Sequence, residues 1–108
     1  MAAPSILVLT HLPDRAAALG LARALVAERL AACVNIGAPV ESMYHWRGQI
    51  ETAQEIPLAI KTCAALYPRV EAAILSLHPY ELPEIVAVPF THGSAPYLDW
   101  LAAETVAP

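Results

Sequence analysis

The sequence predicts an α+β protein in which an antiparallel sheet carries helices on one face. Strand-like runs, rich in aliphatic or alternating residues, are interleaved with two segments of helical periodicity in the order β-α-β-β-α-β. A third helical segment follows the last strand. With 108 residues, the chain has the usual size of one domain, so we expect a single domain over residues 1–108.

The first predicted strand is Ser5 to Thr10, an aliphatic run suited to a strand that is buried on both faces. Asp14 follows it and is a good N-cap, because its carboxylate can accept hydrogen bonds from the first free N–H groups of a helix. The predicted helix has an apolar stripe formed by Leu19, Ala22, Leu25, Val26 and Leu30.

Two further strands are predicted to form a long hairpin. The first starts at residue 32, is interrupted after five residues and resumes over residues 40–46, and residues 47–49 make a turn that contains glycine. The second shows alternating apolar residues over 56–60. Because Pro57 has no N–H to donate, we expect that section to lie at a sheet edge or a bulge. A hairpin of this length is a natural means of pairing with another subunit.

The second half of the chain predicts a helix, a strand and a last helix. The second helix should begin near Pro68 and end before Pro79, because the residue before a proline is disfavoured in helical conformation. A strand is expected over 84–90, and Ser94 is the predicted cap of the last helix. The order is that of ferredoxin-like folds. One face of such a sheet still needs a cover, from the third helix, from a partner subunit or from both.

The composition excludes several classes of partner. The net charge of −4, without a basic cluster, argues against nucleic acid, and no stretch reaches the ~18 apolar residues of a membrane span. The N-terminal stretch lacks the positive region of a signal peptide, so we expect a cytoplasmic protein. The apolar share of 57% is high and favours a homo-oligomer that hides apolar surface.

The stretch from His78 to Ile85, HPYELPEI, is the strongest candidate site. It can be explained first by a stiff helix-to-strand turn, and alternatively by a loop that offers His78, Glu81 and Glu84 as metal ligands. Imidazole nitrogen with carboxylate oxygen suits a divalent metal, and Cu(II) heads the affinity order at such sites. The sequence leaves both interpretations open.

Three other residues are candidates for a binding cleft. Trp46 is expected to pack across strands or against another subunit, and Tyr80 to be half-buried with its hydroxyl at water. Lys61 is expected to pair with a carboxylate or to serve an anion site. We predict no enzyme, because neither a nucleophile motif nor a glycine-rich phosphate loop is present.

Several motifs in one order make the chain resemble the CutA family of divalent-cation tolerance proteins. They are Leu30-Ala31-Ala32-Cys33-Val34-Asn35, Tyr44-His45-Trp46-Arg47-Gly48, Lys61-Thr62, the stretch from His78 to Ile85, and Gly93 through Tyr97-Leu98-Asp99-Trp100. The resemblance covers nearly the whole chain, from about Ile6 to Leu101.

This resemblance implies a homotrimer of ferredoxin-like subunits, similar in architecture to the PII signalling proteins, that binds copper or another divalent ion. The family's proposed copper donors are a cysteine at the end of the first strand and a pair of histidines. This chain has Thr10 at the cysteine position and Leu77-His78 at the histidine pair, so His78 alone carries over.

Two functional hypotheses follow. In the first, the protein is a cytoplasmic homotrimer for divalent-cation tolerance that binds Cu(II) through His78 with Glu81 or Glu84. In the second, it is a PII-like sensor that binds a small metabolite in clefts between subunits. Trp46, Lys61 and Tyr80, with Glu84, would then line the cleft.

Overall fold

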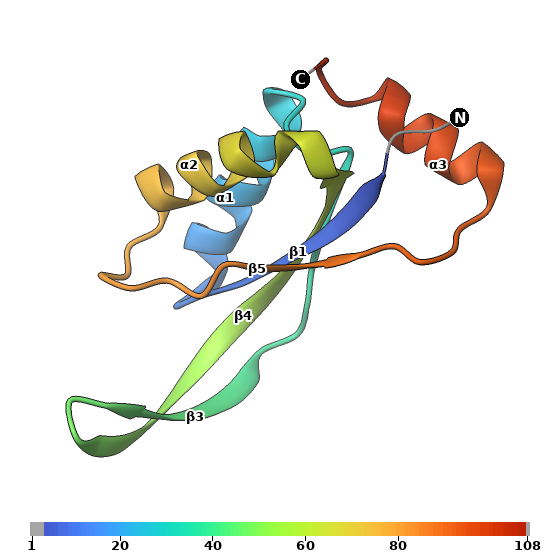
Figure 1. Ribbon diagram of the computed structural model, residues 1–108. Coiled ribbons are helices and arrows are strands. Elements are labelled where there is room, and N and C mark those ends of the chain that lie inside the picture. Colours follow the sequence, from blue (N-terminus) through green and yellow to red (C-terminus); the bar gives the residue numbers. More distant parts are fainter. Residues whose placement is uncertain (1–3, 108) are drawn as a thin grey trace.

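The computed structural model describes residues 4–107 and confirms the predicted α+β class. Its antiparallel sheet has the strand order β2-β4-β1-β5, the order of a ferredoxin-like fold (Figure 1). The strands are β1 (Ser5–Leu12), β2 (Cys33–Ile36), β4 (Gln49–Cys63) and β5 (Val86–Pro89), while β3 (Val40–Trp46) pairs with β4 only. Residues 1–3 and 108 of the predicted single domain lie outside the described part.

One face of the sheet is covered by α1 (Arg15–Ala27) and α2 (Tyr67–Leu77), as Figure 1 shows. A short 3-10 turn, Ala64–Leu66, leads into α2. The largest fully buried apolar side chains are Val8, Leu12, Leu25, Leu58, Ile60, Leu66, Val70, Ile74 and Leu101. Burial of each such side chain contributes about 1.5–3 kcal/mol. This single core fixes the end of β1 against the end of α2.

The first helix begins as the sequence predicts but presents a different stripe. Asp14 accepts a hydrogen bond from the Ala17 N–H at 2.8 Å, which confirms the predicted cap. The buried residues of α1 are Ala18, Leu21, Ala22 and Leu25, whereas Leu19 and Val26 are exposed. The prediction was wrong for these two because they lie one position, about 100°, further round the helix than the buried stripe.

The long hairpin is confirmed and extends well beyond the sheet (Figure 1). Arg47 and Gly48 both have positive φ, 52° and 80°, as a two-residue turn requires, and Trp46 pairs with Gln49 across it. The hairpin makes the molecule elongated, with extents of 48 × 25 × 23 Å. Its outer arms therefore carry side chains away from the core of the molecule.

Pro57 lies in the interior strand β4, opposite His11 of β1; of the two positions expected for it, an edge or a bulge, it is not at a sheet edge but faces the interruption between β2 and β3. Its carbonyl accepts a hydrogen bond from the Gly37 N–H at 2.9 Å, at the interruption between β2 and β3. A strand residue directs its nitrogen and its carbonyl to the same side, so the missing N–H faces this interruption. The ladder to β1 therefore needs no donor from Pro57.

The second helix ends as predicted, and residues 78–85 connect it to β5. The His78 N–H makes the last helical bond, to the Ile74 carbonyl at 2.8 Å, and Pro79 follows. The last helix, α3 (Ala95–Ala103), packs near the end of β4 with Leu101 fully buried. Ser94 occupies its N-cap position, but its side chain makes no capping bond.

The face of the sheet opposite α1 and α2 is only partly covered. Register places Leu9 with Val86 and Leu7 with Val88 on this face, which we call the open face, and both valines are 47% exposed. Within residues 4–107, no helix has the length and hydropathy that crossing a membrane requires.

Candidate functional site

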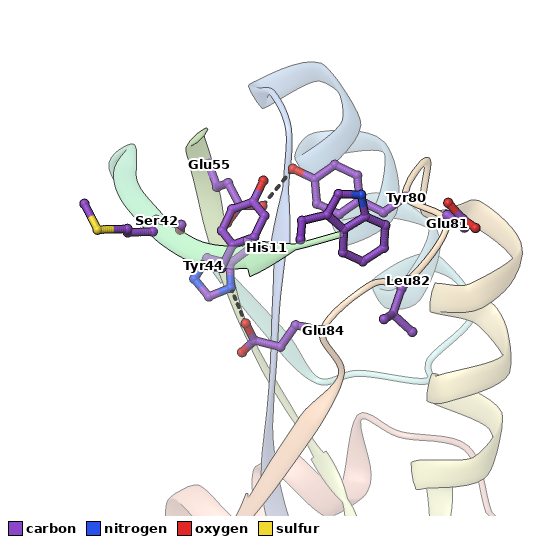
Figure 2. Close-up of a pocket in the computed structure, with 10 residues that line it drawn as sticks. His11, Ser42, Tyr44, Glu55, Tyr80, Glu81, Leu82 and Glu84 are labelled. Atoms are coloured by element: carbon purple, nitrogen blue, oxygen red, sulfur yellow. Dashed lines mark hydrogen bonds and ion pairs between the residues drawn. The ribbon is translucent and has the colours of Figure 1, made fainter. Parts of the chain in front are cut away.

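A pocket of about 550 Å³ lies where the hairpin, the end of β1 and the 78–85 loop meet (Figure 2). This volume falls in the range of about 300–1,000 Å³ that is usual for small-molecule sites. Its lining residues are His11 of β1, Ser42, Met43, Tyr44 and Trp46 of β3, Glu55 of β4, and Tyr80, Glu81, Leu82 and Glu84 of the loop. Segments that are far apart in the sequence therefore build it together.

His78 does not line the pocket, but it connects two residues that do, His11 and Tyr80. Its side chain is buried, with Nδ1 3.1 Å from the Tyr80 N–H donor and Nε2 2.7 Å from the His11 carbonyl oxygen. Because Nδ1 accepts a backbone N–H, Nε2 carries the proton and donates it to the carbonyl. Both ring nitrogens are thus engaged within the protein, and the imidazole joins the end of α2 to the end of β1.

His11 and Glu84 form the first polar pair of the pocket (Figure 2). His11 Nδ1 lies 3.2 Å from Glu84 Oε1. The nitrogen is buried, and within the described chain it has no partner that meets hydrogen-bond geometry. The two atoms are thus close without a hydrogen bond between them, and the hydrogen-bonding capacity of Nδ1 is unused within residues 4–107.

Glu55 and Tyr80 form the second pair. The Tyr80 hydroxyl donates to Glu55 Oε2 at 2.7 Å, and Glu55 is only 9% exposed. Burial, the hydrogen bond to Glu55 and its negative charge together raise the pKa of Tyr80 well above its ordinary value. Tyr80 therefore stays a neutral hydrogen-bond donor to Glu55 at physiological pH.

An ion pair on the outside of the pocket ties the hairpin to the loop. Arg47 Nη2 lies 3.2 Å from Glu81 Oε2, and the Arg47 guanidinium also lies 5.5 Å from the ring centroid of Trp46. Both partners of the ion pair are highly exposed, so it contributes only about 0–1 kcal/mol. Its structural effect is to hold the hairpin turn over the loop.

The structure brings most of the predicted site residues together. Four of them, Trp46, Tyr80, Glu81 and Glu84, line the pocket. His78 does not line the pocket but is hydrogen-bonded to the backbone of His11 and Tyr80, which do. Lys61 does not line this pocket, because it lies in β4 further along the sheet, where its Nζ is 6.0 Å from the ring centroid of Tyr97.

Sequence reasoning did not select six of the ten lining residues; the two of these six that form the polar pairs of the pocket are His11 and Glu55. Their signals were weak: His11 ends an apolar strand, and Glu55 is a carboxylate that directly precedes the alternating run at residues 56–60. In the folded protein Glu55 is buried and His11 is half-buried, and buried polar side chains usually have a hydrogen-bond partner or a functional role. Only the pairing of β1 with β4 shows that they share a site.

The described residues contain no group of three or more His, Cys, Asp or Glu side chains close enough to hold a metal ion. Thr10, at the position where the family resemblance implies a cysteine, is fully buried, and its Oγ1 has no hydrogen-bond partner among residues 4–107. Within residues 4–107, the His11–Glu84 pair brings one imidazole nitrogen and one carboxylate oxygen to within 3.2 Å of each other.

Comparisons with known proteins show the family of this chain. The model of the family described as CutA1 divalent ion tolerance protein matches residues 6–104. The divalent-cation tolerance protein CutA of Thermus thermophilus is 45% identical over 98 residues, which cover 91% of this chain and 95% of that protein. The chain belongs to the CutA family.

Solved structures agree with this assignment. CutA1 of Oryza sativa superposes on this chain with a TM-score of 0.97 at 37% sequence identity. The superposition covers 99% of this chain and 98% of the Oryza sativa chain. CutA1 of the psychrotrophic bacterium Shewanella sp. SIB1 gives a TM-score of 0.94 at 39% identity, with 99% and 100% covered. The chain spans only 56% of the chloroplastic CutA of Arabidopsis thaliana and 52% of human CutA.

Proposed function

We propose that this protein acts in divalent-cation tolerance by binding a divalent metal ion, with Cu(II) as the expected ion, and not by catalysis. The observation that carries the proposal is the His11–Glu84 pair, an imidazole nitrogen without a hydrogen-bond partner 3.2 Å from a carboxylate oxygen. The family description names a tolerance protein and no enzyme activity.

The geometry of this pair fits two ligands of one ion. Nitrogen and oxygen ligands lie about 2.0–2.2 Å from a bound metal such as zinc, so neighbouring ligands are about 3 Å apart. The 3.2 Å separation of the pair matches that spacing. Among divalent ions, Cu(II) binds such nitrogen and oxygen donors most tightly. His78 would then orient the strand that carries His11, whereas binding metal itself would require it to break a hydrogen bond.

We further propose that the active form is a homotrimer in the cytoplasm. Two apolar surfaces support an oligomer: the open face with Val86 and Val88, and the hairpin arms, where Met43 is 70% and Ile50 67% exposed. Neighbouring subunits or water would supply the remaining metal ligands. Among the described residues both cysteines, Cys33 and Cys63, are free thiols, which is usual in a reducing compartment.

The metal proposal is tested by equilibrium dialysis of Cu(II) and Zn(II) against a competing chelator. We expect Glu84→Gln and His11→Gln each to weaken Cu(II) binding at least about tenfold, because each removes one of two protein ligands. Glu41→Gln, an exposed carboxylate of β3 outside the pocket, is the matched control and should bind as the natural protein does.

A His78→Ala variant separates the two possible ligand sets. If His78→Ala abolishes Cu(II) binding and His11→Gln binds Cu(II) normally, then His78 is the metal ligand and the proposed role of His11 as a ligand is contradicted. Unchanged binding in both His11→Gln and Glu84→Gln would overturn the proposed site. Circular dichroism of each variant checks that the fold is kept.

A second candidate function is the binding of a small molecule by a PII-like sensor. The observation that favours it is the pocket itself, which is large enough for a metabolite and is lined by Glu81, the partner of Arg47 in an ion pair. Trp46 and Tyr80 of the predicted cleft line it. The contribution of Lys61 stays a prediction that depends on how subunits associate.

A further inference from the structure

The pocket holds a carboxylate that the rest of the subunit leaves without a counter-charge. Glu55 is 9% exposed, and its Oε2 receives the neutral Tyr80 hydroxyl. Among residues 4–107 the acidic partners of ion pairs are Glu81, Glu84 and Glu104, and Glu55 is not one of them. A buried charge is normally paired, so this carboxylate has room for a cationic partner from outside the subunit.

The walls around Glu55 are aromatic. Tyr44, Trp46 and Tyr80 all line the pocket, and in Figure 2 the hydroxyl ends of Tyr44 and Tyr80 point toward Glu55. The faces of aromatic rings carry partial negative charge and attract cations. Trp46 makes one such contact with a residue that does not line the pocket, since the Arg47 guanidinium lies 5.5 Å from its ring centroid.

The charges of the pocket also select against other ligand classes. Three glutamates, Glu55, Glu81 and Glu84, line it, so an organic anion would meet repulsion from their carboxylates. A metal ion prefers several nitrogen or oxygen donors, and in the described chain Glu55 belongs to no group of three or more acidic, histidine or cysteine side chains. A carboxylate surrounded by rings suits a larger cation with an apolar surface.

We propose that this pocket binds a small organic cation, an alkylated ammonium, with its charge against Glu55 and its alkyl groups against Tyr44, Trp46 and Tyr80. The volume of about 550 Å³ is sufficient for such a ligand. The inference rests on the second candidate function, small-molecule binding, and names its ligand class. It does not depend on metal binding, because neither Glu55 nor the three rings belong to the His11–Glu84 pair.

Isothermal titration with two matched probes tests the charge selection. Choline carries a quaternary ammonium, and 3,3-dimethyl-1-butanol has the same shape without charge. In EDTA at neutral pH, we expect choline to bind saturably and the neutral alcohol to bind at least about tenfold more weakly. EDTA removes metal, so the result is independent of the Cu(II) proposal.

Choline binding to variants then tests whether the ligand occupies this pocket. We expect Glu55→Gln, which keeps an acceptor for the Tyr80 hydroxyl, and Tyr44→Leu, on the hairpin, each to weaken choline binding at least about tenfold. Trp100→Leu on α3 and Glu41→Gln on β3 remove an aromatic ring and a carboxylate outside the pocket, and should leave binding unchanged. Circular dichroism checks the folding of each variant, and Tyr44→Leu serves as the test if Glu55→Gln does not fold.

The possible results distinguish failure of the ammonium site from failure of small-molecule binding as a whole. Equal binding of choline and the neutral alcohol would overturn the cation preference and leave a small-molecule pocket. Binding of neither probe to the natural protein would overturn the ammonium site, and only a wider panel of ligands without a hit would also overturn the second candidate function. Choline binding that is indifferent to both variants would place the ligand elsewhere and overturn the assignment to this pocket.

Discussion

At the scale of single residues, polar side chains at the end of the sheet connect segments that are distant in sequence. His78 joins α2 to β1 through the His11 carbonyl, and Tyr80 joins the 78–85 loop to Glu55 of β4. Such groups are buried or half-buried, where unmade hydrogen bonds are costly. The same contacts therefore stabilise the fold and shape the pocket.

The Tyr80–Glu55 contact predicts how stability depends on alkaline pH. The pKa of Tyr80 is raised above its ordinary value of 10.0, so the folded state keeps a proton that the unfolded state releases above about pH 10. The unfolded state then binds fewer protons, and the free energy of unfolding falls as pH rises. Urea unfolding between pH 8 and pH 11 should show a shallower fall for Tyr80→Phe than for the natural protein.

Tyr67 provides the control for this measurement, because its hydrogen bond to Glu71, with burial and the charge of Glu71, also raises its pKa. Tyr80→Phe should thus reduce the fall without abolishing it, and a double variant with Tyr67→Phe should flatten it further. At pH 8 the loss of the hydrogen bond should cost Tyr80→Phe about 1.5–3 kcal/mol. An unchanged pH dependence in Tyr80→Phe would contradict the role of the contact.

At the scale of elements, the interruption between β2 and β3 lets the hairpin leave the sheet and carry Tyr44 and Trp46 to the pocket. Gly37 and Pro57 meet at this point, where the Gly37 N–H bonds to the Pro57 carbonyl. A β-carbon on residue 37 would lie 2.8 Å from Pro57 Cγ, which is closer than carbon atoms pack. The close approach therefore requires glycine.

Gly37→Ala should destabilise the protein by about 1–3 kcal/mol, the usual cost of overpacking. Gly20→Ala is the matched control, because nothing lies within 4 Å of an added β-carbon there and the residue is inside α1. That control should gain about 0.5–1 kcal/mol from helix propensity. Denaturant unfolding measures both, and a Gly37→Ala variant as stable as the natural protein would disprove the steric role of this contact.

At the scale of the whole molecule, the proposed homotrimer accounts for apolar surface that one subunit leaves in water. The open face and the projecting hairpin are both exposed, and burial of apolar area yields about 25 cal/mol per Å². Light scattering should therefore give a mass three times the 11.5 kDa of the chain. A monomeric mass would remove the trimer proposal.

Charge placed on the open face should disrupt the trimer. Val88→Lys would bury a lysine at the proposed interface, and we expect it to shift the mass toward that of the monomer. Leu75→Lys, at an exposed apolar position of α2 on the helix side, is the matched control and should leave the mass unchanged. The same mass for both variants would place the interface away from the open face.

The sequence by itself determined the elements, their order and the family. Pro79, the Asp14 cap and the Arg47-Gly48 turn act through local backbone preferences, which is why the ends of the helices and the hairpin turn were predictable. The fold class followed from this order. The exposed positions in α1 were misassigned because helical periodicity alone leaves the direction of the buried face uncertain by about one residue.

Only the tertiary structure decided which side chains share a site. His11 and Glu55 reach the pocket through the pairing of β1 with β4, and Lys61 lies elsewhere in the same strand. The engagement of both His78 nitrogens depends on contacts with β1 and with the loop that follows it. Long-range strand register and the path of the hairpin set these distances, and neither is encoded in the spacing of residues along the chain.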